Sequence, residues 1–162
     1  MHRENGTLVD LNPSTSRAVG KMKATITQRF ITDALTYDVE CDCRFIFFCT
    51  KSPSDPTSTS DISSRREWKT QYVKLFYEKD KVVSVDGGRT APTFTAEELG
   101  RYPEGYRYLG AAQARLGHKI LEGLPTMDNQ AFYDMYKAID GWLQGKNVDK
   151  LLQVPQDYQP KF

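Results

Sequence analysis

The sequence predicts an α+β fold in which an antiparallel sheet comes first and helices follow. Residues 21–77 contain segments with an apolar side chain at every second position, whereas residues 95–145 place apolar side chains at helical spacing. The strand segments follow one another without a helical pattern between them, which favours antiparallel pairing over alternating βαβ units. With 162 residues, 39% of them hydrophobic, the chain is long enough for one domain with its own core.

The expected sheet begins with a short strand over residues 7–11, and a turn rich in Asn, Pro and Ser follows at residues 12–16. Residues 21–31 alternate between apolar and polar side chains, as a half-buried strand does. The next strand is expected over residues 37–49 and becomes apolar on both faces toward its end. One face of it carries Tyr37, Val39, Cys41, Cys43, Phe45, Phe47 and Cys49.

Residues 51–66 are rich in Ser, Thr, Pro and Asp, and we expect them to form an exposed loop. The last strand is expected over residues 68–77. The charged run that follows, Glu78 to Lys81, is interpreted as the solvated end of this strand. We expect a single domain over residues 1–145 and a C-terminal tail over residues 146–162.

The helical part begins at Thr95, which forms a capping box with Glu98 three residues later. Apolar residues at helical spacing predict a second helix over residues 106–120. Asp128 is expected to cap a last helix over residues 129–143, and Gly145 follows at a position where glycine commonly ends helices.

The charge balance excludes several function classes. Lys and Arg number 22 and Asp and Glu number 21, so the net charge of +1 gives no overall field that would hold nucleic acid or an anionic membrane. No apolar run approaches the roughly 20 residues of a membrane helix, and the polar N-terminus lacks the apolar stretch of a signal peptide. Three clustered cysteines favour a reducing compartment, so we expect a cytoplasmic protein.

Motifs for phosphate binding and for a nucleophilic serine are absent from the sequence. Cys41 and Cys43 share a strand face with aromatic side chains, which is typical of small core residues. A zinc site formed with His2 and His118 has no recognisable ligand spacing, so we expect no metal. The tyrosines around Pro103–Gly105 can hold a hydroxyl-bearing ligand or form a packing corner.

Four segments of the chain resemble SnoaL-like proteins of the nuclear transport factor 2-like superfamily, with the closest likeness to fungal and bacterial members. They are the strand end Tyr77-Glu78-Lys79-Asp80, the corner Pro103-Glu104-Gly105-Tyr106-Arg107, the ending Trp142-Leu143-Gln144-Gly145 and the upstream Thr27-Gln28-Arg29-Phe30. The resemblance covers about residues 17–145. It implies a curved antiparallel sheet wrapped by helices into a cone, with an apolar ligand pocket at the mouth.

Members of this superfamily usually begin with two or three helices that close the cone. In this sequence His2 lies where that segment should end, and Thr27 stands where a second family histidine is expected. We therefore expect a cone that is incomplete at its N-terminus. The chain is then either a shortened gene product or a cone that a partner completes, with a homodimer as the expected form.

The resemblance implies two alternative functions. The first is a cofactor-independent lyase, isomerase or cyclase that acts by proton transfer on a small aromatic or polyketide-like metabolite of secondary metabolism. The residues assigned to it are His2, Tyr72 and Tyr77 for catalysis, and Arg29, Phe45 and Phe47 for substrate binding. The second is a non-catalytic, ligand-binding or dimer-forming member of the same fold, which predicts an exposed apolar sheet surface.

Overall fold

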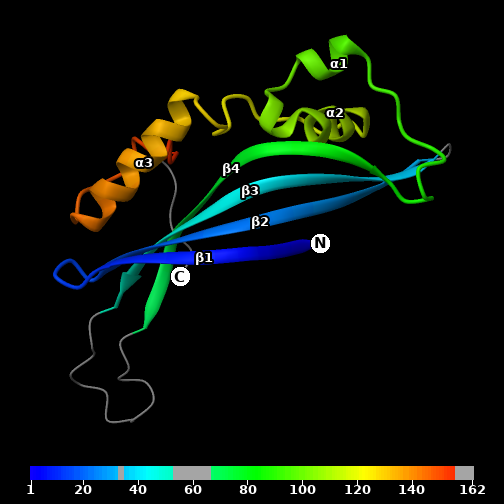
Figure 1. The fold of residues 1–162 in the computed structure, drawn as a ribbon. Coiled ribbons are helices and arrows are strands. Elements are labelled where there is room, and N and C mark those ends of the chain that lie inside the picture. Colours follow the sequence, from blue (N-terminus) through cyan, green and yellow to red (C-terminus); the bar gives the residue numbers. More distant parts are fainter. Residues whose placement is uncertain (33–34, 53–66, 156–162) are drawn as a thin grey trace.

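A computed structural model of the chain describes residues 1–32, 35–52 and 67–155, and these form one four-stranded sheet followed by helices (Figure 1). The strands are β1 (His2–Asn12), β2 (Arg17–Ile31), β3 (Thr36–Lys51) and β4 (Trp68–Ser84). They pair in the order β1-β2-β3-β4, and every pair is antiparallel. The α+β class, with a curved antiparallel sheet and C-terminal helices, is therefore confirmed. From residue 53 on, the expected loop lies outside the described residues, as does the tail from residue 156.

All four strands are longer than the sequence predicts, and β1 and β4 are extended most. β1 begins at His2 rather than at residue 7, because its polar first half pairs through the backbone and so leaves no apolar alternation to detect. A register shift between Glu4 and Thr7 interrupts this pairing, and Gly6 adopts a positive φ of 122° there. β4 continues to Ser84, so the charged run after Tyr77 belongs to the sheet and not to its end.

The pairing of β2 with β3 runs without a register shift from Arg17–Thr50 to Ile31–Thr36. Alternate residues of these strands therefore keep the same face throughout. We name the two sides after a buried member of each. The Cys41 face carries Phe30, Tyr37, Val39, Cys41, Cys43, Phe45 and Phe47, and the Phe48 face carries Val19, Ile46, Phe48, Tyr72 and Phe76.

The helices cover opposite faces of the sheet at opposite ends. They are α1 (Ala96–Gly100), the 3-10 turn η1 (Glu104–Tyr106), α2 (Arg107–Arg115) and α3 (Gln130–Leu143). Ala112 of α2 packs with Phe30 and Val39 on the Cys41 face. α3 packs on the Phe48 face near the turn between β1 and β2, where Asn12 Nδ2 donates to the Leu143 carbonyl at 2.8 Å (Figure 1).

The helix ends differ from two of the expectations. The capping box of Thr95 and Glu98 is confirmed. The helix expected to reach residue 120 ends at Arg115, because Gly117 turns the chain with a φ of 82°. Asn129, not Asp128, caps α3 by accepting the Phe132 N–H at 2.9 Å, while Asp128 lies before the helix with a φ of 66°.

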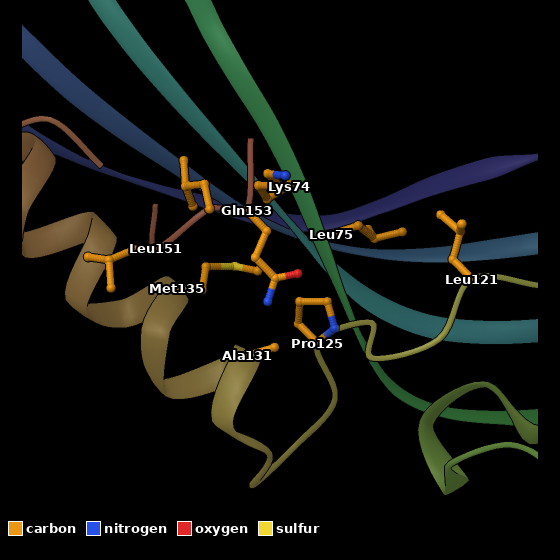
Figure 2. Close-up of a pocket in the computed structure, with 9 residues that line it drawn as sticks. Lys74, Leu75, Leu121, Pro125, Ala131, Met135, Leu151 and Gln153 are labelled. Carbon is orange, nitrogen blue, oxygen red and sulfur yellow. The ribbon is translucent and has the colours of Figure 1, made fainter. Parts of the chain in front are cut away.

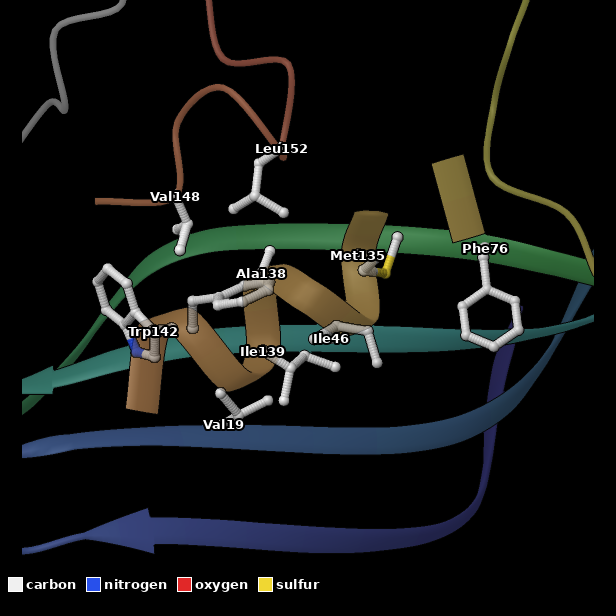
Figure 3. Close-up of a cluster of buried hydrophobic side chains, with 10 residues drawn as sticks. Val19, Ile46, Phe76, Met135, Ala138, Ile139, Trp142, Val148 and Leu152 are labelled. Atoms are coloured by element: carbon white, nitrogen blue, oxygen red, sulfur yellow. The ribbon is translucent and has the colours of Figure 1, made fainter. Parts of the chain in front are cut away.

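The larger core lies between α3 and the Phe48 face (Figure 3). Its buried members are Val19, Ile46, Phe48, Phe76, Met135, Ala138, Ile139, Trp142, Val148 and Leu152. Trp142 is only 5% exposed, and its indole N–H donates to the carbonyls of Ala18 and Cys49 at 3.2 Å each. The indole N–H is therefore satisfied inside the core, and it fixes α3 to β2 and β3. Among the described residues no helix has the length and apolarity needed to cross a membrane.

The chain passes from one face to the other around the edge of β4. The Tyr77 N–H donates to the Pro125 carbonyl at 3.0 Å, and Thr126 forms a parallel bridge with Tyr77. On the Cys41 face, η1 approaches so closely that a Cβ on Gly105 would lie 2.6 Å from the Tyr77 carbonyl oxygen. Glycine at position 105 is therefore required for the helical segment to lie on the strand.

We predict that Gly105→Ala destabilises the fold by about 1–3 kcal/mol, because the added methyl group must push η1 away from β4. Urea unfolding followed by circular dichroism measures the loss. Gly100→Ala is the matched control: its Cβ would meet nothing within 4 Å, so a change below about 0.5 kcal/mol is expected. Equal stability losses in the two variants would contradict this account of Gly105.

Candidate functional site

A pocket of about 140 Å³ lies on the Cys41 face, between β4 and α2. Most of its lining is apolar, with polar groups from two tyrosines, an amide and a lysine. The lining residues are Tyr77, Tyr106, Leu109, Gly110, Gln113, Lys119, Ile120, Leu121 and Leu124. The rings of Tyr77 and Tyr106 lie 5.2 Å apart at 55°, and the two residues come from two of the four segments that carry the family resemblance.

Burial raises the pKa of both phenols of this pocket above the ordinary tyrosine value. Both hydroxyls therefore keep their protons at neutral pH and can donate hydrogen bonds. The Gln113 amide is oriented by its own hydrogen bond to Gln28 Oε1 at 2.8 Å. An apolar pocket with a few placed donors can hold a small aromatic molecule through its oxygen atom.

Asp80 lies between β4 and the first turn of α2, next to this pocket. Its Oδ2 accepts the Leu109 N–H at 2.7 Å, which ties the carboxyl group to the first turn of α2. Its Oδ1 is buried and has no hydrogen-bond partner among the described residues. Burial raises the pKa of Asp80 to about 6, against the opposing effect of the α2 backbone N–H groups and the charge of Arg107. The interpretation of Asp80 as part of a solvated strand end is therefore wrong.

A β-bulge brings Asp80 to this side of the sheet. Tyr77 pairs with Cys43 and Asp80 pairs with Cys41, so four residues of β4 (77–80) lie opposite three residues of β3 (41–43). The register shift leaves Glu78 as the extra residue, and its carboxylate pairs with Arg44 Nε at 2.5 Å. Without the bulge, Tyr77 and Asp80 would point to opposite faces.

The thiols beside Asp80 are core groups, as the sequence predicts. Cys41 and Cys43 are 0% and 1% exposed, and their Sγ atoms donate to the carbonyls of Gly105 and Ala24 at 3.5 Å each. Burial raises the pKa of Cys43 to about 11 and that of Cys41 still further. Both thiols stay protonated at neutral pH, so neither is suited to act as a nucleophile. The described residues contain no group of three or more His, Cys, Asp or Glu placed to hold a metal ion.

The structure places three other predicted site residues together on the Cys41 face. The His2 ring lies 5.8 Å from the Phe45 ring, which stacks on Phe47 at 6.2 Å. Tyr77 points to the same face, but it lies on β4, whereas His2 lies on β1. Three inter-strand spacings separate these strands, which is about 14 Å measured across the sheet. The described structure therefore does not bring His2 and Tyr77 to one reacting atom.

The two remaining predicted residues lie on the Phe48 face. The Tyr72 hydroxyl donates to Asp149 Oδ1 at 2.7 Å, and its ring packs against Phe48 and Trp142. Arg29 forms a two-point ion pair with Asp38 at 2.8 and 2.9 Å. Tyr77 is thus the one predicted site residue that lines the pocket described above.

The part of the Cys41 face that α2 does not cover is apolar and exposed within the described chain. Val9 and Leu11 of β1 are 61% and 55% exposed, and Val73 of β4 is 52% exposed. Phe45 and Phe47 lie between them, half-buried. The exposed apolar sheet surface expected for a dimer-forming protein is therefore present.

Comparisons with known proteins give fungal relatives, and no family model matches the chain. The chain is 37% identical over 157 residues to an uncharacterized protein of Emericella nidulans. It is 39% identical over 157 residues to a PEP2-like protein of Fusarium vanettenii and 34% identical over 157 residues to pea pathogenicity protein 2 of the same fungus. These matches cover 92% of this chain but only 62–63% of each relative, so the chain spans less than two thirds of their length.

We predict that replacing Asp80 removes a pH dependence of stability. A carboxyl group whose pKa is higher in the folded chain favours folding when protonated, so this contribution is lost as pH rises from about 4 to about 6. Between pH 4 and pH 6 the free energy of unfolding of the wild type should therefore fall relative to that of Asp80→Asn. Above pH 6 the difference between the two should stay constant. Chemical unfolding at several pH values measures the difference.

Leu116→Ser serves as the control, because Leu116 is 51% exposed and the substitution changes no titratable group. Its difference from the wild type should not change over the same pH interval. A wild type that gains stability between pH 4 and pH 6 relative to Asp80→Asn would contradict the placement of Asp80.

Proposed function

From the homology with fungal PEP2-like proteins and the geometry of the pocket, we propose a nuclear transport factor 2-like, SnoaL-like protein that binds a small aromatic or polyketide-like metabolite. The ligand lies between Tyr77 and Tyr106, and the protein acts on it as a cofactor-independent lyase, isomerase or cyclase. The pocket itself carries this proposal: an apolar space with two phenols and an amide at its wall.

The size of the pocket supports a ligand part no larger than one ring. An apolar cavity of about 150 Å³ takes up benzene, and this pocket has about 140 Å³. Leu109, Ile120 and Leu124 supply apolar contacts for such a ring. A hydroxyl or carbonyl oxygen on the ligand can then face the phenols.

The chemistry proposed is enolisation next to a carbonyl group. The Tyr77 hydroxyl donates a hydrogen bond to the carbonyl oxygen and stabilises the enolate that forms when an α-proton leaves. Solvent water, which reaches the open pocket, takes that proton and later returns one to the carbon. Asp80 is a positioning residue in this scheme, because it holds the first turn of α2 through Leu109 and does not line the pocket.

Deuterium exchange tests this function. Phenylacetone incubated with the protein in D₂O should exchange its α-protons faster than in buffer, as followed by proton NMR. Tyr77→Phe keeps the ring and removes the donor, so the excess rate should fall by about tenfold or more. Tyr133→Phe is the matched control on α3, where Tyr133 is 49% exposed, and should leave the rate unchanged. An exchange rate equal to that of buffer would contradict the catalytic proposal.

The exposed part of the Cys41 face favours a second candidate, the dimer-forming protein. β1 is an edge strand, and its outer side is unpaired in the described structure. Such an edge can pair antiparallel with the same strand of a second copy across a two-fold axis, which would also bring Val9 and Leu11 of both copies together.

Light scattering after gel filtration measures this association. We predict a dimer for the wild type and a shift toward monomer for Leu11→Ser, because the serine replaces an apolar contact across the two-fold axis. Leu116→Ser is the matched control, since Leu116 is 51% exposed beyond the end of α2. A monomeric wild type at high micromolar concentration would rule out the dimer.

A further inference from the structure

A second cleft, of about 220 Å³, opens between the edge of β4 and α3 (Figure 2), and it shares Leu121 with the Tyr77 pocket. Its wall is mostly apolar and comes from three parts of the chain. The lining residues are Lys74, Leu75, Leu121, Pro125, Ala131, Met135, Leu151, Leu152 and Gln153. Neither the sequence motifs nor the proposed function uses this cleft.

Lys74 is the one charged residue of that lining. It lies on the Phe48 face, and the residue that pairs with it on β3 is the fully buried Ile46. Within the described chain the Lys74 ammonium group has neither a hydrogen bond nor an ion pair. Burial lowers the pKa of Lys74, since the cleft withdraws water from the charge and supplies no carboxylate in return.

Two other lysines of β4, Lys79 and Lys81, each lie near a carboxylate. Lys79 and Lys81 are 73% and 69% exposed in their side chains, yet each lies near a carboxylate of β3: Asp42 at 3.7 Å and Glu40 at 3.2 Å. Lys74 is less exposed than either, and the adjacent position of β3 is apolar. An unpaired ammonium group in an apolar cleft has an unfavourable solvation free energy that an incoming anion would offset.

We propose that this cleft binds an apolar ligand with a terminal carboxylate, which pairs with the Lys74 ammonium group. The apolar body of the ligand lies against Leu75, Leu121 and Met135, whose side chains surround the space in Figure 2. The Gln153 amide, which points into the middle of the cleft, donates a second hydrogen bond to the carboxylate. This inference does not depend on the function proposed for the Tyr77 pocket.

Octanoate and its neutral counterpart 1-octanol test the proposal, with binding followed by chemical-shift titration at low salt. The wild type should bind octanoate at least about tenfold more tightly than octanol, the margin expected of a charge-assisted hydrogen bond. Lys74→Met keeps the length of the side chain and should abolish this preference while octanol still binds. Lys74→Arg should retain most of it.

Lys69→Met is the matched control, since Lys69 is exposed on the same strand. It should leave the preference for octanoate intact. Equal binding of octanoate and octanol by the wild type, or an unchanged preference in Lys74→Met, would overturn the proposal.

A second measurement uses the wild-type chain and so does not depend on the folding of a variant. Reductive methylation with a ¹³C label reports the pKa of each lysine by NMR. Because a carboxylate stabilises the charged form, octanoate should raise the pKa of Lys74 and octanol should not. No octanoate-dependent rise at Lys74 would contradict the ion pair.

Discussion

The close contact between η1 and β4 determines where every later element of this protein lies. Gly105 approaches the Tyr77 carbonyl to a distance that no side chain would permit, and on the outer edge the Tyr77 N–H binds the Pro125 carbonyl. The backbone of Tyr77 thus contacts the chain twice: at Gly105 on the Cys41 face, and at Pro125, where the chain passes to the Phe48 face. α2 and α3 therefore cover opposite sides of one sheet, and both the Tyr77 pocket and the Lys74 cleft form beside this crossing.

The bulge at Glu78 determines which residues of β4 face the candidate site. It places Tyr77 and Asp80 on one face, where Asp80 can bind the first turn of α2 and the Tyr77 ring can meet Tyr106. The extra residue faces the other way and pairs with Arg44. One added residue in β4 thus separates a structural ion pair from the polar groups of the candidate site.

The sequence predicts those features of the structure that depend on alternating apolar residues or on local helix caps. β2 and β3 were predictable because their pairing is regular and one side of each is largely buried, and Thr95 was predictable because a capping box is local. The bulge, the positive φ at Gly117 and the cap by Asn129 depend on tertiary packing. For the same reason the sequence grouped Tyr72 with Tyr77, although their side chains leave β4 on opposite faces, and it interpreted the half-buried Asp80 as solvated.

In the proposed function, the ligand occupies the space between Tyr77 and Tyr106. Titration of the chain with 4-fluorophenol, followed in a ¹H–¹⁵N chemical-shift map, tests this placement. The largest shifts are expected on Leu109, Gly110 and Leu124, which line that pocket. Shifts confined to His2, Phe45 and Phe47, at the other part of the same face, would contradict it and move the binding site to the open half of the sheet.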